Sequence, residues 1–324
     1  MSAQRPTPPQ PPAGVIAHRD LAYVIDGHER QMLDLYLPAN SAENGAALAN
    51  NQNAENGAAL ANNQNAENGA ALANTQPENY PLIIWVHGGA FRMGSKEGNP
   101  NNPPPFHYAT QGYAVASINY RLSQHAIWPA QIEDCKAAVR WLRAHAAEYS
   151  LDPERFAAWG PSAGGHLVAM LGVTGHVTEF EVGAYLDVSS RIQCVVDYFG
   201  PTDFLQMDAQ RLPHGMIHDA PDSPESELVG GNIQAHPHKV ARANPITYIP
   251  QDDITADVPP FLIVHGDQDP LVPYGQSLLL VEALEKMAAD VTFYTVQGGG
   301  HGGFTDPAVP KLTAEFLTKH LRAA

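Results

Sequence analysis

Short apolar runs typical of buried strands alternate with helix-like segments from about residue 80 to the end of the chain. The runs include PLIIWV (81–86), CVVDYFG (194–200) and FLIVHG (261–266). Strands that are apolar on both faces are typical of parallel sheets, because helices cover both faces of such sheets. One helix-like segment, 131–149, carries its apolar residues on a single face, namely Ile132, Cys135, Val139 and Leu142. The pattern predicts an α/β fold with a mostly parallel central sheet and helices on both faces.

The length of 324 residues is about twice that of a typical domain, but two segments need not belong to a folded core. Residues 1–14 are Pro-rich and predict a flexible tail. Residues 42–77 carry a twelve-residue repeat, AENGAALANNQN, which recurs unchanged at 54–65 and then degenerates. The repeat has too little apolar surface to offset its ordering entropy, so we interpret it as an expanded surface loop rather than an adhesive tract. The remainder, on the order of 275 residues, predicts a single domain over 15–324.

The segment before the repeat contains two β-like runs, LAYVI at 21–25 and MLDLYL at 32–37. The polar sequence DGHER between them holds an Asp-Gly pair, which is a turn signal. We therefore expect an antiparallel hairpin at the start of the fold. The repeat then lies between the second run of this hairpin and the next strand-like run, at 81–86.

Charge and composition exclude several classes of partner. The chain carries 18 Lys and Arg residues against 34 Asp and Glu residues, a formal net charge of -16 at pH 7. Binding of nucleic acid or of an anionic membrane is therefore not expected. No stretch reaches the roughly 18 apolar residues of a membrane span, and no apolar signal-like region is visible at the N-terminus. A cytoplasmic location is the default expectation, with a secreted mature form left open; the oligomeric state is not predicted.

The strongest local motif is Gly-Pro-Ser-Ala-Gly at 160–164, a G-x-S-x-G segment. It lies between the apolar run 156–159 and a helix-like segment, which is where a nucleophile elbow places its serine. In such an elbow the serine occupies a strained turn, and the flanking glycines avoid contacts that side chains would make. Ser162 is therefore the candidate nucleophile. The competing interpretation is a Ser and Gly turn that caps a helix.

A serine nucleophile needs a base and an acid that orients the base, and both should follow it in the chain. His301 lies in GGGHGGF after the apolar run VTFYTV and is the candidate base. Asp267 and Asp269 both follow the run 261–266, at the end of a strand where α/β sheets place catalytic groups. The residues alone do not separate these two acids, because Asp267 could instead hold the turn.

An acyl-transfer site also needs donors for the developing oxyanion. Small residues follow the first central strand in the segment His87-Gly88-Gly89-Ala90. We expect the backbone N–H groups of Gly89 and Ala90 to serve, with that of Ala163, and Gly88 is a further candidate. His87 is expected to be structural.

Cofactor signals are absent from the sequence. The tightest histidine pair is His-Pro-His at 236–238, and there is no C-x-x-C, H-E-x-x-H, dinucleotide-binding or P-loop motif. No metal site and no cofactor are expected. His166, one helical turn after Ser162, is expected to pack or cap rather than to catalyse.

Taken together, these segments resemble the α/β-hydrolase esterases. The motifs that carry the resemblance are HGGAFRMGSK, SINYRLS, WGPSAGGHLVAMLG, FGPTDF, ANPITYI, HGDQDPLVPYGQS and GGGHGGF, spread over about residues 20–323 without the repeat. The chain is most similar to the hormone-sensitive-lipase-like group and its small carbohydrate esterases, which include acetylxylan and feruloyl esterases. The resemblance implies Ser162, Asp269 and His301 as the catalytic triad. The group usually has HGGG, so Ala90 replaces a glycine, which should preserve a backbone N–H donor.

The stretch of about 203–249 interrupts the alternation of strands and helices, and its prolines predict a short cap over an open site. The implied activity is that of a serine carboxylesterase acting on short-chain acyl esters through an acyl-enzyme, such as acetyl or feruloyl esters of plant polysaccharide. The substrate would be a small-molecule or polysaccharide-linked ester. Two alternatives stay open: a serine peptidase of the prolyl-oligopeptidase type, and a non-catalytic binding or assembly protein that works through its repeat.

Overall fold

A computed structural model describes residues 10–39, 79–100, 102–249 and 258–322. The repeat predicted at 42–77 and most of the Pro-rich tail lie outside the described residues. Among the residues that are described, no helix is long and apolar enough to cross a membrane.

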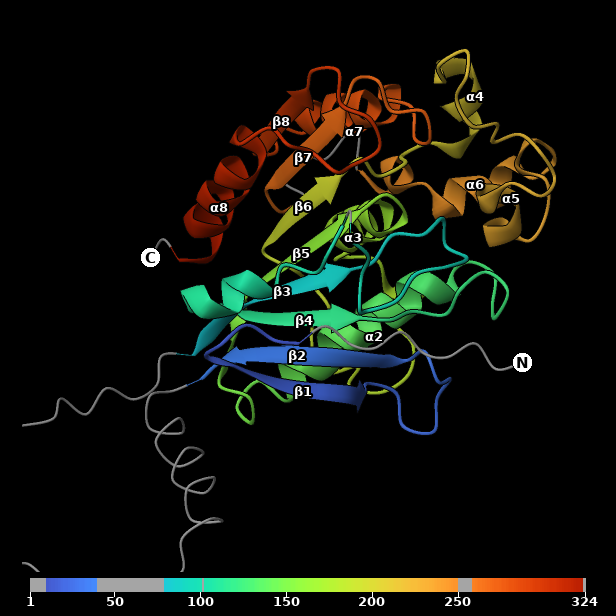
Figure 1. Cartoon of the computed structure of the whole chain (residues 1–324). Helices are drawn as coiled ribbons and strands as arrows, with labels where there is room; N and C mark the ends of the chain where they lie inside the picture. The colour runs from blue at the N-terminus through green and yellow to red at the C-terminus, as the bar shows by residue number, and fades with distance from the viewer. Residues whose placement is uncertain (1–9, 40–78, 101, 250–257, 323–324) are drawn as a thin grey trace, which may run out of the picture.

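Eight strands form one sheet in the order β1-β2-β4-β3-β5-β6-β7-β8 (Figure 1). Their bounds are β1 Val15–Ala22, β2 Met32–Pro38, β3 Tyr80–Val86, β4 Ala114–Ile118, β5 Leu151–Pro161, β6 Cys194–Tyr198, β7 Phe261–Gly266 and β8 Val291–Val296. From β4 onward in this order, neighbouring strands pair in parallel. The two remaining pairs, β1 with β2 and β2 with β4, are antiparallel. The predicted mostly parallel sheet is confirmed. The antiparallel entry hairpin is also present, but its first strand is Val15–Ala22 and not the predicted run 21–25.

Helices pack on both faces of the sheet (Figure 1). The longer helices are α2 Ala130–Ala144, α3 Ala163–Val173, α7 Gly275–Lys286 and α8 Ala308–Leu321, and η1 Phe106–Gln111 is a 3-10 helix. Alternate residues of each strand point to opposite faces. On β3, Ile84 packs in the core that contains α2, α3 and α7, while Ile83 packs in the core that contains η1 and α8. The predicted face of α2 is buried, with Ile132, Cys135, Val139 and Leu142 all fully inaccessible.

The parallel pairing brings the candidate site together, because parallel strands all end at the same edge of a sheet. The segment 87–90 follows β3, Ser162 follows β5, Asp269 follows β7 and His301 follows β8. The turn after β5 is fixed to its neighbour because the Ser162 N–H donates to the Tyr198 carbonyl at 2.8 Å. Four segments far apart in the sequence therefore meet at one edge.

The segment 203–249 consists of short helices next to this edge (Figure 1). They are η3 Phe204–Gln206, α4 Met207–Gln210, α5 Pro224–Val229, η4 Ile233–Ala235, α6 Pro237–Ala243 and η5 Pro245–Tyr248. His166 of α3 holds this segment, since its Nε2 lies 2.6 Å from the Ala243 carbonyl and its ring stacks on Phe204. Burial lowers the pKa of His166 to about 4, so the ring is neutral near pH 7. This placement agrees with the expected packing role of His166.

Both cysteines are buried and unpaired. Cys135 lies on α2 and Cys194 begins β6, on opposite sides of the sheet.

A buried carboxyl group supports the turn that carries Ser162. Asp197 of β6 is 1% exposed, and its Oδ1 accepts the Gly200 N–H at 2.9 Å. A Cβ added to Gly165 of α3 would lie 2.3 Å from the same oxygen, so the carboxyl group packs directly against the elbow helix. Burial raises the pKa of Asp197 to about 7, although the hydrogen bond from Gly200 opposes the shift.

This buried acid predicts a pH-dependent loss of stability. A carboxyl group with its ordinary pKa in the unfolded chain and a raised pKa in the folded chain destabilises the fold as pH rises, by about 1.4 kcal/mol per pH unit from roughly pH 4 to pH 7. Asp197→Asn retains the acceptor for Gly200 but cannot ionise. We compare the free energies of unfolding of this variant and the parent protein by urea unfolding. The difference should shift in favour of the variant by roughly 3 kcal/mol between pH 4.5 and pH 8. A stability difference that is the same at both pH values would contradict this.

Candidate active site

Ser162 sits in a tight turn between β5 and α3. Its backbone has φ 57° and ψ -122°, a conformation that residues other than glycine rarely adopt. The flanking glycines are required by close packing: a Cβ on Gly160 would lie 2.5 Å from the Gly164 carbonyl carbon, and one on Gly164 would lie 2.0 Å from the Val86 carbonyl oxygen. The turn can therefore form only where these two positions lack side chains, as the motif at 160–164 predicted.

The loop after β3 passes close to this turn. A Cβ on Gly88 would lie 2.8 Å from the Pro161 carbonyl oxygen, so the loop backbone lies directly beside the residue that precedes the serine. Gly89 has φ 120° and Ala90 has φ 53°, both in the left-handed range. Gly88, Gly89 and Ala90 line the same cavity as Ser162 and Ala163. The structure thus brings all the predicted oxyanion-hole residues next to the candidate nucleophile.

Arg30 and His87 hold this loop in place. The guanidinium Nη2 of Arg30 donates to His87 Nε2 at 2.9 Å, and His87 Nδ1 donates to the Gly88 carbonyl at 2.7 Å. Arg30 also donates to the carbonyls of Gly94 and Tyr120. Burial, with the charge of Arg30, lowers the pKa of His87 to about 3, so its ring stays neutral. His87 is structural, as expected, whereas nothing in the local sequence around Arg30 indicated its role.

The second half of the site is the pair formed by Asp269 and His301. His301 Nδ1 lies 2.7 Å from Asp269 Oδ2. The other carboxylate oxygen accepts the N–H groups of Leu271 and Val272, at 2.8 and 3.0 Å. Asp269 is 2% exposed, whereas the His301 side chain is 17% exposed and faces the cavity that contains Ser162. The three residues implied by the resemblance therefore converge.

His265 is a second histidine on the same carboxylate. Its Nε2 lies 3.0 Å from the Val272 carbonyl and 3.3 Å from Asp269 Oδ2, so this nitrogen carries the proton. Its Nδ1 then accepts the Ser277 hydroxyl at 2.7 Å. Burial alone would raise the pKa of Asp269, but hydrogen bonds from His265 and His301 hold it well below its ordinary value. His265 lies in the HGDQD segment, but no motif there indicated its partners.

Asp267, the other acid that the sequence left open, has a different partner. Its Oδ1 accepts the Gly298 N–H at 2.7 Å and so ties the loop after β7 to the loop after β8. The structure places Asp269 against His301 and gives Asp267 this loop contact.

The cavity over Ser162 has a volume of about 360 Å³. Met93 and Leu271 line it and are 61% and 43% exposed, so its mouth is open to solvent.

The wall of this cavity also contains a buried pair from the segment 203–249. His218 Nδ1 and Glu225 Oε2 lie 3.1 Å apart. Burial alone would lower the pKa of His218, but the contact with Glu225 raises it above the ordinary value. No motif in the sequence indicated this buried pair.

The rings of His236 and His238, the tightest histidine pair in the sequence, have centroids 6.4 Å apart. Within the described ranges, no group of three or more His, Cys, Asp or Glu side chains is arranged to hold a metal ion.

Comparison with known proteins identifies the family. The BD-FAE family model matches residues 70–284. The chain belongs to the BD-FAE family. It is 31% identical to a solved structure described as a truncated form of carbohydrate esterase from gut microbiota, with a TM-score of 0.73, covering 95% of this chain and 97% of the other. A bifunctional GH43-CE protein of Bacteroides eggerthii is 30% identical, with a TM-score of 0.69 over 94% of this chain and 38% of that one.

Among curated proteins, this BD-FAE chain is 32% identical over 251 residues to the probable carboxylic ester hydrolase LipM of Mycobacterium tuberculosis (strain ATCC 25618 / H37Rv). The match covers 74% of this chain and 56% of LipM. The chain spans about half the length of the curated relatives it matches, with 53% and 55% for two others. The expected α/β-hydrolase fold and the resemblance to the esterase group are confirmed by these matches.

The packing of the elbow predicts a sharp difference between two glycines. Gly164→Ala would place a methyl group against the Val86 carbonyl, whereas Gly300, in the loop that carries His301, has open space at its Cβ position and no positive φ. We expect Gly164→Ala to lower the free energy of unfolding by about 3 kcal/mol or more, and Gly300→Ala to change it by about 0.5 kcal/mol or less. Urea unfolding measures both. Equal effects would contradict the close packing of the turn.

Proposed function

We propose that this chain is a serine esterase that hydrolyses short-chain acyl esters through an acyl-enzyme. The observation that carries the proposal is the convergence of a strained serine, a histidine bonded to a buried carboxylate, and a glycine-rich loop on one open cavity. Membership of the BD-FAE family supports it, as do relatives named as esterases.

In the proposed mechanism, Ser162 Oγ attacks the ester carbonyl carbon while His301 removes the hydroxyl proton. Because His301 Nδ1 faces Asp269, its Nε2 is the nitrogen left to take that proton. The His301 imidazolium then gives the proton to the leaving alcohol. Water, activated by the same histidine, cleaves the acyl-enzyme and restores Ser162.

Asp269 would orient the imidazole and stabilise its cation. The carboxylate suits this role because four donors surround it, two from the backbone and two from histidines. Its low pKa keeps it ionised over the whole working range of pH. His265, which contacts Asp269 but lines no part of the cavity, would act as a positioning residue.

The oxyanion would be held by backbone N–H groups of Gly89, Ala90 and Ala163, with Gly88 as a further candidate. Ala163 begins α3, so its N–H is one of the first helix donors without an intrahelical acceptor. Ala90 lies in the left-handed range, where the usual glycine would be relaxed, and the bonds from Arg30 and His87 stabilise the loop that contains it.

The proposed substrates are esters of short acyl groups on a bulky alcohol, such as acetyl or feruloyl esters of plant polysaccharide. The segment 203–249 would be a short cap that leaves the cavity open at Met93 and Leu271. An open mouth accommodates a large alcohol, and the short helices of the cap provide no deep tunnel for a long acyl chain. The carbohydrate esterase among the solved relatives supports a sugar ester.

Substitutions at Ser162, Asp269 and Asp267 should show which of the two acids acts in catalysis. Ser162→Ala should lower kcat/KM for p-nitrophenyl acetate by several orders of magnitude, because the nucleophile is lost. Asp269→Asn should lower it by roughly a thousandfold or more, because the imidazolium loses its partner. The matched variant Asp267→Asn should cost less than about tenfold, because Asp267 bonds only a loop N–H. Near-normal turnover by Ser162→Ala, or a larger loss for Asp267→Asn than for Asp269→Asn, would overturn the assignment.

The acyl preference is tested with acetyl, butyryl and octanoyl p-nitrophenyl esters. We expect kcat/KM to fall from acetyl to octanoyl, because the cap offers no long apolar tunnel. A proline p-nitroanilide in the same series tests the peptidase alternative. Faster cleavage of octanoyl than of acetyl would overturn the short-chain proposal, and faster cleavage of the anilide than of any ester would favour a peptidase.

A further inference from the structure

The segment 203–249, the proposed cap, is bonded to the loop that carries Asp269. The Met216 N–H donates to the Pro270 carbonyl at 2.8 Å. The backbone of the preceding residue is also close, because a Cβ on Gly215 would lie 3.2 Å from the same oxygen. Met216 and Leu271 both line the catalytic cavity, so this contact is made at the cavity wall. The cap therefore contacts the residue that directly follows Asp269.

A single peptide group connects this contact to Asp269. The Pro270 carbonyl and the Leu271 N–H belong to the same planar peptide unit. The carbonyl accepts the N–H of Met216, while the N–H donates to Asp269 Oδ1 at 2.8 Å. A hydrogen bond to the carbonyl also polarises the peptide and strengthens its N–H as a donor. The cap and the carboxylate thus bind opposite sides of one rigid group, and Asp269 Oδ2 faces His301.

The contact with the cap adds something that the loop itself does not provide. The bonds from the next two N–H groups to Asp269 Oδ1 are local, so they orient the carboxylate only relative to its own loop. Before Asp269, the Gln268 N–H donates to the Gly299 carbonyl at 2.9 Å, in the loop after β8. After Asp269, the bond from Met216 to Pro270 ties the loop to a different part of the chain. The loop is therefore held on both sides of the carboxylate.

Asp208 of α4 holds the cap residues that make this contact. Its Oδ1 accepts the His218 N–H at 2.8 Å, and its Oδ2 accepts the Asp219 N–H at 3.1 Å. Met216 lies two residues before His218, so these bonds fix the direction from which its N–H approaches Pro270. The Asp208 side chain is 21% exposed and does not line the catalytic cavity. Asp208 therefore acts on the site through the backbone that it holds.

The stretch 215–219 has further supports, which should keep it folded without Asp208. His218 Nδ1 lies 3.1 Å from Glu225 Oε2 of α5, and these side chains are 2% and 5% exposed. The Arg211 guanidinium donates to three carbonyls, those of residues 212, 213 and 215. Loss of Asp208 alone should shift this stretch rather than unfold it.

We propose that Asp208 is a positioning residue for Asp269, and that the cap supports the loop 269–272 through Met216 in addition to covering the site. The proposal rests on the proposed esterase function and adds a residue to its mechanism. It also gives the segment 203–249 a part in the reaction that does not depend on contact with substrate.

The proposal predicts which kinetic step changes. Without Asp208, the Met216 N–H should move away from its carbonyl partner, and the peptide that donates to Asp269 should turn. Asp269 would then orient the His301 imidazole less well. Because small displacements at a reacting group lower the rate strongly, the loss should appear in kcat, while KM changes little.

The first test compares Asp208→Ala with Asp222→Ala, which removes an exposed carboxylate from the same segment. We expect Asp208→Ala to lower kcat for p-nitrophenyl acetate by about tenfold, with KM within about twofold, and Asp222→Ala to leave both unchanged. Asp208→Asn retains one acceptor oxygen and should recover part of the loss. Thermal unfolding checks the fold, and Asp208→Asn alone carries the test if Asp208→Ala does not fold. A rise in KM without a fall in kcat, or equal losses in the two alanine variants, would overturn the proposal.

A double-mutant cycle shows whether Asp208 acts through Asp269. In the Asp269→Asn background, Asp208→Ala should lower kcat by less than about twofold, because the carboxylate that it positions is gone. The same tenfold loss in both backgrounds would contradict a positioning role.

A measurement without turnover separates this proposal from the esterase function. The proton between His301 Nδ1 and Asp269 Oδ2 should give a low-field proton NMR signal, which His301→Ala removes and so identifies. Asp208→Ala should move this signal upfield, because the bond weakens, whereas Asp222→Ala should not. A shifted signal in a protein that hydrolyses no ester would overturn the esterase function and support the positioning role. An unchanged signal in Asp208→Ala would overturn the positioning role, whatever the activity.

Discussion

The contact between the end of β3 and the turn after β5 governs the rest of this site. The Val86 carbonyl lies so close to Gly164 that a methyl group there would be 2.0 Å away. This approach sets the distance between the loop 87–90 and Ser162, because both follow directly from the two strands. A looser contact would separate the nucleophile from the backbone N–H groups proposed for the oxyanion. Stability and function therefore depend on the same few atoms at this edge.

Two buried histidine networks preserve that geometry from opposite sides. On one side Arg30 bonds His87, which in turn bonds the Gly88 carbonyl. On the other side His265 and the backbone of the loop after β7 hold Asp269. His87 is neutral, and neither network exposes its central ring to solvent. Buried side chains that bond to one another and to the backbone provide a fixed frame for the residues that must react.

The sequence predicted local features well and long-range contacts poorly. The alternation of strands and helices and the motif at 160–164 depend on neighbours in the chain, so the sheet, α2 and the elbow could be predicted. The choice between Asp267 and Asp269 depends on the loop after β8, about 30 residues away, and Arg30 lies 57 residues from His87. The first strand was misplaced: it spans Val15–Ala22, not the run 21–25, because its ladder with β2 begins at Val15 and passes through a bulge.

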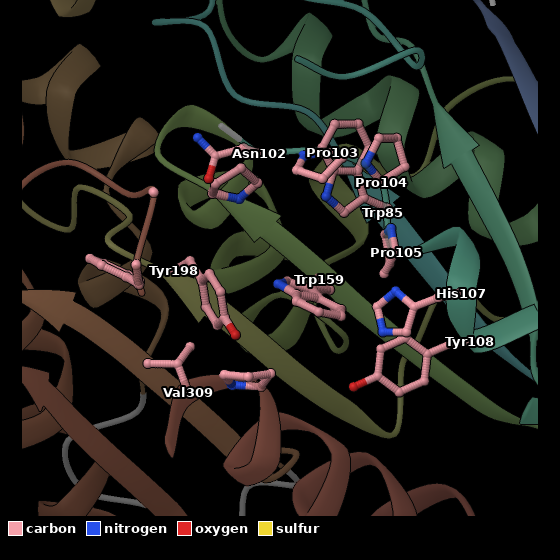
Figure 2. Close-up of a pocket in the computed structure, with 14 residues that line it drawn as sticks. Trp85, Asn102, Pro103, Pro104, Pro105, His107, Tyr108, Trp159, Tyr198 and Val309 are labelled. Carbon is pink, nitrogen blue, oxygen red and sulfur yellow. The ribbon is translucent and has the colours of Figure 1, made fainter. Parts of the chain in front are cut away.

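The strands that end at the catalytic site also line a second cavity next to it. Trp159 lines this cavity, on the η1 and α8 side of the sheet (Figure 2), and Ser162 lines the catalytic cavity, so three residues along the chain separate the two linings. Pro161 lies between them and lines both cavities. β2 ends at Pro38, before the insertion, and β3 begins at Tyr80, after it. Both points lie at the amino ends of β3 and β4, because β2 runs antiparallel to β4 and β3 runs parallel to it. The chain can therefore vary in length there without moving either cavity, whereas a change at β5 would alter both.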